Sequence, residues 1–270
     1  MNEFDFGSGL VPAHRHQNGN GWVADTATVS TTAYIAEGAM VSDTAIVSGN
    51  AVIRDTAVVS GNAIVSDRAI ISGAARVSET AQVSDLAQVM GASRIAGSAK
   101  ISGNTRVRDS ASVHGDAEIS GTADISDSAL VSERAVIAGA AKISGAAVIA
   151  GDAQLSDTAQ VLDQAQILGY AKVSGNARVR DQAQVLGTAQ IADSAVVAET
   201  AQILGNATVS GNAVVSGAAR IWGNTLVTDR ARVAGRARLS GEVQVRDRAQ
   251  VTGNAQILGD TVVAGKEIVG

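Results

Sequence analysis

The sequence predicts an all-β fold, a triangular parallel β-helix with 18 residues in each coil. Three observations predict it. An aliphatic residue, always Val, Ile or Leu, recurs every six positions from Val23 to Val269 without an insertion. Ala stands two positions before it with few exceptions, and Gly, Asp or Glu usually stands two positions after it. A fixed period of this kind indicates a solenoid, because each repeat can bury its apolar face only against its neighbours.

Each repeat of six residues contains one short strand and one corner. In the run Ala-x-(Val/Ile/Leu), the first and third side chains lie on one side of the strand and the middle one lies on the other. The Gly/Asp/Glu position suits a turn, since Gly and Asp tolerate the left-handed backbone of a tight corner. Three such repeats close one triangle, so residues 23–270 predict about 13–14 coils with Ala and the aliphatic residues inside.

Residues 1–22 precede the first repeat and differ from it in composition. They contain both Phe residues, Phe4 and Phe6, together with the only Pro and Trp22. An uncovered first coil would expose unpaired strand edges. We therefore expect residues 1–22 to be an N-terminal cap and residues 23–270 to be the β-helix. The alternative is that residues 1–22 dock onto an unknown partner protein.

The composition excludes several classes of protein. The chain has 270 residues, of which 46% are apolar, 2% are aromatic and none is Cys, so disulfide scaffolds and thiolate metal sites are excluded. The net charge of −5 gives no basic surface for nucleic acid. No apolar run is long enough to span a membrane, and the first residues lack the pattern of a signal peptide. We expect a cytoplasmic protein, with an extracellular or virion-associated location as the alternative.

The repeat resembles the hexapeptide-repeat, left-handed parallel β-helix superfamily, which includes acyltransferases and γ-type carbonic anhydrases. The opening GLVPAHRHQNGNGWVADTATV and the VSGNA runs further resemble its YdcK-type branch, whose members are often named transferases. The resemblance implies left-handed coils and the packing of copies as parallel trimers. The usual unit of the superfamily has Gly directly after the aliphatic residue, whereas in this chain Gly lies one position later.

Residues 18 apart stack on one face of the coil, so the outward positions form columns. On the first face, the position after the aliphatic residue is mostly apolar in the C-terminal half, and another Leu lies close by. The predicted interface consists of Leu168, Leu186, Leu204, Trp222, Leu226 and Leu258. Apolar strips of this kind usually mark interaction surfaces. We expect the chain to associate with itself, with a parallel trimer favoured by the resemblance. The alternatives are a monomer with an apolar face and a foreign partner.

Two other sets of stacked residues are visible. An amide ladder that stabilises the stack is expected on the third face from Gln166, Gln184 and Gln202. Stacked corner carboxylates repel one another, and a candidate site for a hard cation consists of Asp163, Asp181 and Glu199. Arg stands beside many corner carboxylates, as in Arg108 and Asp109. Charge compensation by Arg is the favoured account, and we expect no metal and no cofactor.

One pair of residues is a candidate for catalysis. Acyltransferases of the superfamily that the repeat resembles use His as a general base near a subunit boundary, and His114 with Asp116 could form an oriented base. The uninterrupted repeat has no inserted loop that would build a pocket for acyl-CoA. We therefore predict a non-catalytic structural or interaction protein. The alternative is a hexapeptide-repeat acyltransferase that uses acyl-CoA, with His114 near a subunit boundary.

Overall fold

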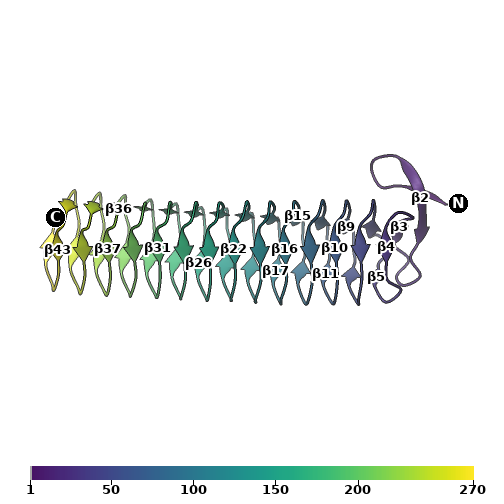
Figure 1. Ribbon diagram of the computed structural model, residues 1–270, viewed down its shortest axis with the longest axis horizontal. Helices are drawn as coiled ribbons and strands as arrows, with labels where there is room; N and C mark the ends of the chain where they lie inside the picture. The colour runs from purple at the N-terminus through teal and green to yellow at the C-terminus, as the bar shows by residue number, and fades with distance from the viewer. Residues whose placement is uncertain (1) are drawn as a thin grey trace. The chain divides into compact units, whose positions relative to one another are not determined.

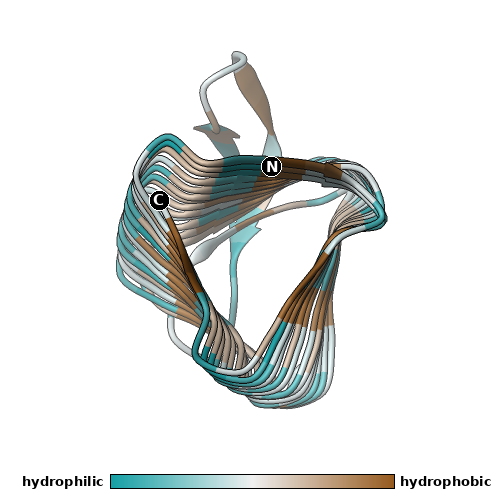
Figure 2. Ribbon diagram, turned by 90° about the vertical axis from the view of Figure 1, so that its left-hand side faces the viewer, coloured by the Kyte–Doolittle hydropathy of each residue, from teal (hydrophilic) through white to brown (hydrophobic). Residues whose placement is uncertain are grey.

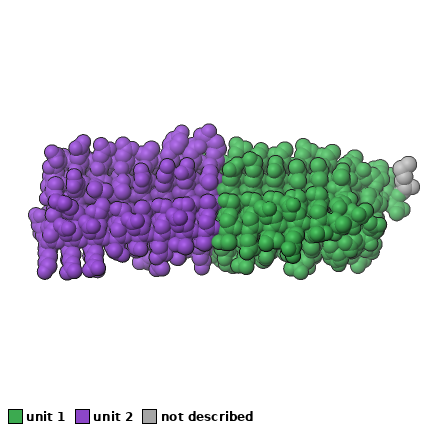
Figure 3. Space-filling model, turned by 60° about the horizontal axis from the view of Figure 1, so that its bottom comes forward, with its two compact units in different colours: residues 1–133 green, residues 134–270 purple. Residues whose placement is uncertain are grey.

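The computed structural model describes residues 2–270, which contain strands and turns but no helix. The chain divides into two compact units, Met1–Glu133 and Arg134–Gly270 (Figure 3). Each unit is a parallel β-solenoid in which strands 18 residues apart pair with each other. Viewed end-on, a coil has three sides that meet at three corners (Figure 2). The predicted fold class is confirmed, and the handedness stays a prediction of the resemblance.

Three sheets form the sides of the coil in unit 1 (Figure 1). Sheet 1 contains β1 (Glu3–Asp5), β2 (Leu10–Arg15), β3 (Trp22–Ala24), β6 (Met40–Val41), β9 (Val58–Val59), β12 (Arg76–Val77), β15 (Arg94–Ile95), β18 (Ser112–Val113) and β21 (Leu130–Val131). Sheet 2 contains β4 (Thr28–Val29), β7 (Ile46–Val47), β10 (Ile64–Val65), β13 (Gln82–Val83), β16 (Lys100–Ile101) and β19 (Glu118–Ile119). Sheet 3 contains β5 (Tyr34–Ile35), β8 (Val52–Ile53), β11 (Ile70–Ile71), β14 (Gln88–Val89), β17 (Arg106–Val107) and β20 (Asp124–Ile125).

Unit 2 has three sheets as well, numbered by the same positions in the 18-residue period. Sheet 1 contains β24 (Val148–Ile149), β27 (Gln166–Ile167), β30 (Gln184–Val185), β33 (Gln202–Ile203), β36 (Arg220–Gly223), β39 (Arg238–Gly241) and β42 (Gln256–Gly259). Sheet 2 contains β22 (Val136–Ile137), β25 (Gln154–Leu155), β28 (Lys172–Val173), β31 (Gln190–Ile191), β34 (Thr208–Val209), β37 (Leu226–Val227), β40 (Gln244–Val245) and β43 (Val262–Val263). Sheet 3 contains β23 (Lys142–Ile143), β26 (Gln160–Val161), β29 (Arg178–Val179), β32 (Val196–Val197), β35 (Val214–Val215), β38 (Arg232–Val233), β41 (Gln250–Val251) and β44 (Ile268–Val269).

The core of each coil consists of the predicted Ala and aliphatic columns. Ala45 and Val47 are 0% exposed, while Ile46 between them is 39% exposed. The regular strands are two residues long, one shorter than the Ala-x-Val prediction. The Ala residue still bonds to the neighbouring coil, since the carbonyl of Ala45 accepts a hydrogen bond from Thr28 N of the preceding coil at 2.9 Å. The alternation of inward and outward side chains follows directly from strand geometry.

The corner position has the left-handed backbone that the sequence predicted. From Asp43 to Gly265, every sixth residue has positive φ, and the Asp and Glu residues among them have φ of 58–62°. The first three corners, Asp25, Thr31 and Glu37, are outside this set. These three belong to the coil that contacts the N-terminal segment, where the backbone of Asp25 donates a hydrogen bond to the carbonyl of Pro12 at 3.0 Å.

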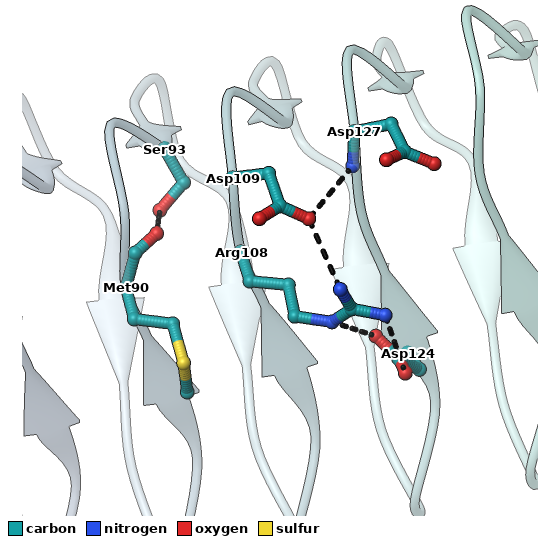
Figure 4. Close-up of polar contacts among 6 residues, drawn as sticks. All are labelled: Met90, Ser93, Arg108, Asp109, Asp124 and Asp127. Atoms are coloured by element: carbon teal, nitrogen blue, oxygen red, sulfur yellow. Dashed lines mark hydrogen bonds and ion pairs between the residues drawn. The ribbon is translucent and has the colours of Figure 1, made fainter.

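Corner carboxylates bind the backbone of the next coil in addition to the Arg partners that the sequence predicted. In Figure 4, Asp109 Oδ2 accepts a hydrogen bond from Asp127 N at 3.2 Å. Asp55 likewise accepts from Gly73 N at 2.8 Å. Arg108 does pair with Asp109, at 3.1 Å, but it also binds Asp124. A carboxylate that accepts a backbone N–H offsets the cost of the left-handed conformation, so Asp can replace Gly at a corner.

Two corner carboxyl groups have lowered pKa values because of the hydrogen bonds that they accept. The hydroxyl of Ser66, followed by the backbone N–H of Asp85, holds the pKa of Asp67 below its ordinary value. The backbone N–H of Gly175, followed by the hydroxyl of Ser156, does the same to the pKa of Asp157. Hydrogen bonds to the ionised form favour that form, so both carboxylates hold their charge to lower pH than free Asp.

Larger residues replace Ala at a few inward positions. The hydroxyl of Ser93 donates to the carbonyl of Met90 at 2.8 Å (Figure 4), and that of Thr225 donates to the carbonyl of Trp222 at 2.8 Å. The buried hydroxyl of Thr105 has no hydrogen-bond partner among the described residues. The three four-residue strands of unit 2, β36, β39 and β42, each end two residues before such a replacement: Thr225, Val243 and Thr261.

Candidate functional site

The predicted apolar column lies along one edge of sheet 1 in unit 2. The backbone N–H of Leu168 and that of Leu186 each bond to the next coil, and Trp222 pairs in register with Ser240, which pairs with Leu258. Leu168, Leu186, Leu204 and Trp222 are half-buried, whereas Leu258 is 61% exposed.

Leu226 is different, because it lies in β37 on sheet 2, beyond the corner at Gly223. The structure therefore places five of the six predicted residues in one column and Leu226 on the adjacent side.

The corner beside this column carries only glycine in unit 2. The ladder runs through Gly151, Gly169, Gly187, Gly205, Gly223, Gly241 and Gly259. A Cβ added at Gly187 would lie 3.1 Å from Gly205 N, whereas one added at Gly97 in unit 1 would lie 2.6 Å from Gly115 N. Asp occupies corners of similar φ elsewhere in the chain. A Cβ at Gly187 would therefore meet a tight contact, but a less crowded one than at Gly97.

The amide ladder lies on the other side of the apolar column, which corrects the expectation that it occupies the third face. Gln166 directly precedes Ile167 in β27, so its side chain projects from sheet 1. Gln184 Nε2 donates to Gln166 Oε1 at 3.4 Å, and Gln202 Nε2 donates to Gln184 Oε1 at 3.0 Å. The ladder and the leucines therefore belong to one surface.

Together these columns form a surface without charge. Three successive coils contribute the segments QILGY, QVLGT and QILGN, which are residues 166–170, 184–188 and 202–206. We call these segments the neutral strip. It presents amides, half-buried leucines, a glycine edge and then Tyr170, whose side chain is 59% exposed. Depletion of charge around apolar side chains is typical of the centre of a protein interface.

The same edge of unit 1 is polar. Its column after the aliphatic residue consists of Ala24, Ser42, Ser60, Ser78, Ala96, His114 and Ser132. The adjoining corner has carboxylates at several coils, among them Asp43, Glu79 and Glu133. Apolar and charge-free character at this edge is therefore specific to unit 2.

His114 and Asp116 lie at one corner of unit 1, after β18. Both side chains are exposed, and the described residues show no hydrogen bond between them. An oriented base needs a hydrogen-bonded partner and a substrate held nearby. His114 and Asp116 are neighbours only because they are two positions apart in the sequence. They do not form the oriented pair that the sequence suggested.

The candidate metal ligands have backbone partners. Asp163 Oδ2 accepts from Asp181 N at 3.2 Å, and Asp181 Oδ2 accepts from Glu199 N at 3.0 Å. Arg180 also pairs with Asp181 at 3.2 Å. Across residues 2–270, no group of three or more His, Cys, Asp or Glu side chains is arranged to hold a metal ion. Asp163 and Asp181 therefore form hydrogen bonds between neighbouring coils.

The N-terminal aromatic residues pack together at the first coil. The ring of Phe4 stacks on Trp22 with centroids 4.4 Å apart and meets Phe6 edge-on at 4.9 Å. The guanidinium of Arg15 lies 4.1 Å from the centroid of Trp22. Strands β1 and β2 form an antiparallel hairpin, and β2 pairs antiparallel with β3. The hairpin therefore covers the outer edge of sheet 1 at the place where the sequence predicted a cap.

A concentration of arginine in unit 2 was missed by the sequence analysis. Seven Arg but only three acidic residues lie between Arg220 and Arg248. Two of these arginines, Arg220 and Arg238, are register partners on sheet 1, next to Trp222. The overall charge of −5 conceals them, because it averages over the whole chain. A count of charge along each column would have revealed the pair.

Comparison with known proteins supports the fold. Residues 201–217 match the family model described as YdcK Beta solenoid repeat. The matched segment covers β33, β34 and β35, and both units show the same strand and corner pattern. These findings support a hexapeptide-repeat-like β-helix family. No curated protein matches the chain. The described residues include no helix that could span a membrane.

Proposed function

We propose that this β-solenoid protein is an assembly module that associates with further copies of itself through the neutral strip of unit 2. The observation that supports the proposal most strongly is the pairing of the Leu168, Leu186 and Leu204 column with an all-glycine corner. A Cβ would be less crowded at Gly187 than at Gly97, and carboxylates occupy equivalent corners elsewhere. An edge kept both apolar and uncharged is what a contact between proteins needs.

The leucine column is also suited to binding at low entropic cost. Leu186 and Leu204 are already half-buried against their own sheet, so little side-chain freedom remains to be lost on contact. Strands in register hold the column straight over successive coils. A second copy offers the same flat edge, so both partners bring matching apolar surfaces.

The test measures the mass of the protein in solution by light scattering. We expect the wild type to have a multiple of the chain mass of 27.1 kDa, and the double variant Leu186→Lys/Leu204→Lys to return to a single chain. The matched control is Ser60→Lys/Ser78→Lys, at the same edge of unit 1, which leaves the mass of the oligomer unchanged. Circular dichroism checks that each variant remains folded. A monomeric wild type, or an unchanged mass in the leucine variant, would refute the proposal.

The acyltransferase alternative remains a prediction from the family resemblance. It requires that the chain bind acyl-CoA and that His114→Ala impair transfer. Calorimetry with acyl-CoA, followed by an assay of acyl transfer, would reveal both properties. Absence of binding in the assembled protein would remove this alternative.

A further inference from the structure

A shallow hollow of about 240 Å³ lies on sheet 1 of unit 2. It is lined by Gln202, Leu204, Arg220, Trp222 and Arg238. The hollow combines two cations, an indole, an amide and an aliphatic side chain. Gln202 and Leu204 belong to the neutral strip, whereas the two cations and the indole lie outside it.

The two guanidinium groups lie on adjacent coils without a counter-charge. Arg220 and Arg238 are Cα register partners, and paired strands are about 4.8 Å apart. Both side chains are exposed, and within residues 2–270 neither forms an ion pair. By contrast, Arg134 of the same unit binds Asp152 at 2.7 Å. Two stacked cations repel each other, and an oxyanion between them would relieve the repulsion with charge-assisted hydrogen bonds.

The indole of Trp222 is available for stacking. The other tryptophan, Trp22, is engaged by Phe4 and Arg15, whereas the described residues give Trp222 no stacked ring. Its backbone is fixed, because its carbonyl accepts the hydroxyl of Thr225 at 2.8 Å. Trp222 lines the hollow, where its indole offers a flat surface to a planar group.

Gln202 supplies a directional polar group. Its Nε2 donates to Gln184 Oε1 at 3.0 Å, which holds the amide in place and leaves Oε1 as an acceptor. An acceptor fixed beside an aromatic ring suits the N–H edge of a heterocycle that stacks on that ring. An amide, an indole and a guanidinium pair thus converge on a ligand that has both a planar polar ring and an anionic group.

We propose that this hollow binds a nucleoside phosphate. The phosphate lies between Arg220 and Arg238, the base stacks on Trp222, and Gln202 Oε1 accepts a hydrogen bond from the base. Guanidinium groups recognise phosphate oxygens with particular strength, and stacking of a base on an aromatic side chain contributes about 1–3 kcal/mol. Gln202 and Leu204 also belong to the neutral strip, but the proposal rests on Arg220, Arg238 and Trp222, which lie outside it.

Unit 1 contains a matched control. Arg76 and Arg94 are register partners on sheet 1 of that unit, and they too lack an ion pair in the part of the chain that the structure describes. The residues that follow their strands are Ser78 and Ala96 instead of Trp222 and Ser240. A stacked arginine pair without an indole therefore tests whether two cations suffice.

The experiment titrates the protein with AMP, inorganic phosphate and adenosine. The chain has two Trp residues, so a Trp22→Phe background makes the emission report on Trp222 alone. We expect AMP to quench this emission and to bind at least about tenfold more tightly than phosphate or adenosine. Arg220→Gln/Arg238→Gln weakens AMP binding at least about tenfold, while Arg76→Gln/Arg94→Gln leaves it unchanged. Calorimetry on the chain with Trp22 intact repeats the measurement and includes Trp222→Leu.

Several results would overturn the proposal. Absence of AMP binding refutes it, as does AMP binding that survives Arg220→Gln/Arg238→Gln. Equal affinity for phosphate and AMP refutes it as well, because Trp222 would then contribute nothing to recognition of the base. The mass of each variant by light scattering separates a failure of this site from a failure of self-association, since the arginine variants keep the wild-type mass.

Discussion

Sheet 1 has the same kinds of inward residues in both units, but the outward residues along one edge are polar in unit 1 and apolar in unit 2. In unit 1 the edge displays Ser60 and Ser78 beside corners that include Glu79, whereas in unit 2 it displays Leu186 and Leu204 beside glycine alone. Away from the first and last coils, the inward Ala and aliphatic residues are fully buried in both units. The contrast shows that the coil depends on its inward columns and its corner backbone, which leaves the outward columns free to differ.

The corner position explains how this freedom arises. A coil can satisfy the left-handed corner either with Gly, which has no Cβ, or with Asp, whose carboxylate binds the next corner N–H. Gly and Asp both occur at the corners of each unit, yet the corners along one edge of unit 2 are all Gly. The choice between Gly and Asp thus sets the surface charge of an edge without changing the fold.

Self-association should weaken most when the edge of unit 2 receives a carboxylate like those of unit 1. In Gly187→Asp the added Cβ would be less crowded than at Gly97, and self-association should weaken at least about tenfold, since the added charge would be desolvated in the contact. Analytical ultracentrifugation over a range of concentrations measures the association constant.

The control for this variant is the equivalent edge of unit 1. Gly97→Asp should leave association unchanged but lower the free energy of unfolding by about 1–3 kcal/mol, because its Cβ would lie 2.6 Å from the backbone of Gly115. Equal loss of association in the two variants would mean that the neutral strip is not the contact surface.

Two buried threonines should respond in opposite directions. Thr105→Ala in unit 1 should raise the free energy of unfolding by about 1 kcal/mol, because its hydroxyl is buried without a partner in the described chain. Thr225→Ala in unit 2 should lower it by about 1 kcal/mol, because the bond to Trp222 is lost. Urea denaturation of both variants measures the two changes, and destabilisation of similar size in both would contradict the assignment of hydrogen bonds.

The smallest effect should be a shared response to acid. The pKa values of Asp67 in unit 1 and Asp157 in unit 2 are lowered in the folded state, so their contribution to stability is present above the pKa of unfolded Asp. That contribution is lost as the pH falls through the folded-state pKa. Asp67→Asn and Asp157→Asn should each reduce the loss of melting temperature between pH 7 and pH 3. An unchanged pH profile in either variant would argue against the bond to the next coil.

The strand columns could be predicted from sequence because every residue of the repeat recurs at a fixed interval. Val47 and Asp43 took the inward and corner positions that their spacing predicted. The ladder of Gln166 was predicted on the third face and lies on sheet 1. This place could have been predicted, because Gln166 directly precedes Ile167 in the sequence. The arginine pair escaped notice because charge was considered for the whole chain and not column by column.

The period, the inward columns and the left-handed corners follow from the sequence alone, because they depend on residue spacing and on what each residue type tolerates. The partners of the polar groups became visible only in three dimensions. Asp109 binds the backbone of Asp127 in the next coil, and the first strands fold back as an antiparallel hairpin. These contacts join segments that a six-residue pattern does not relate to each other, so the pattern could not specify them.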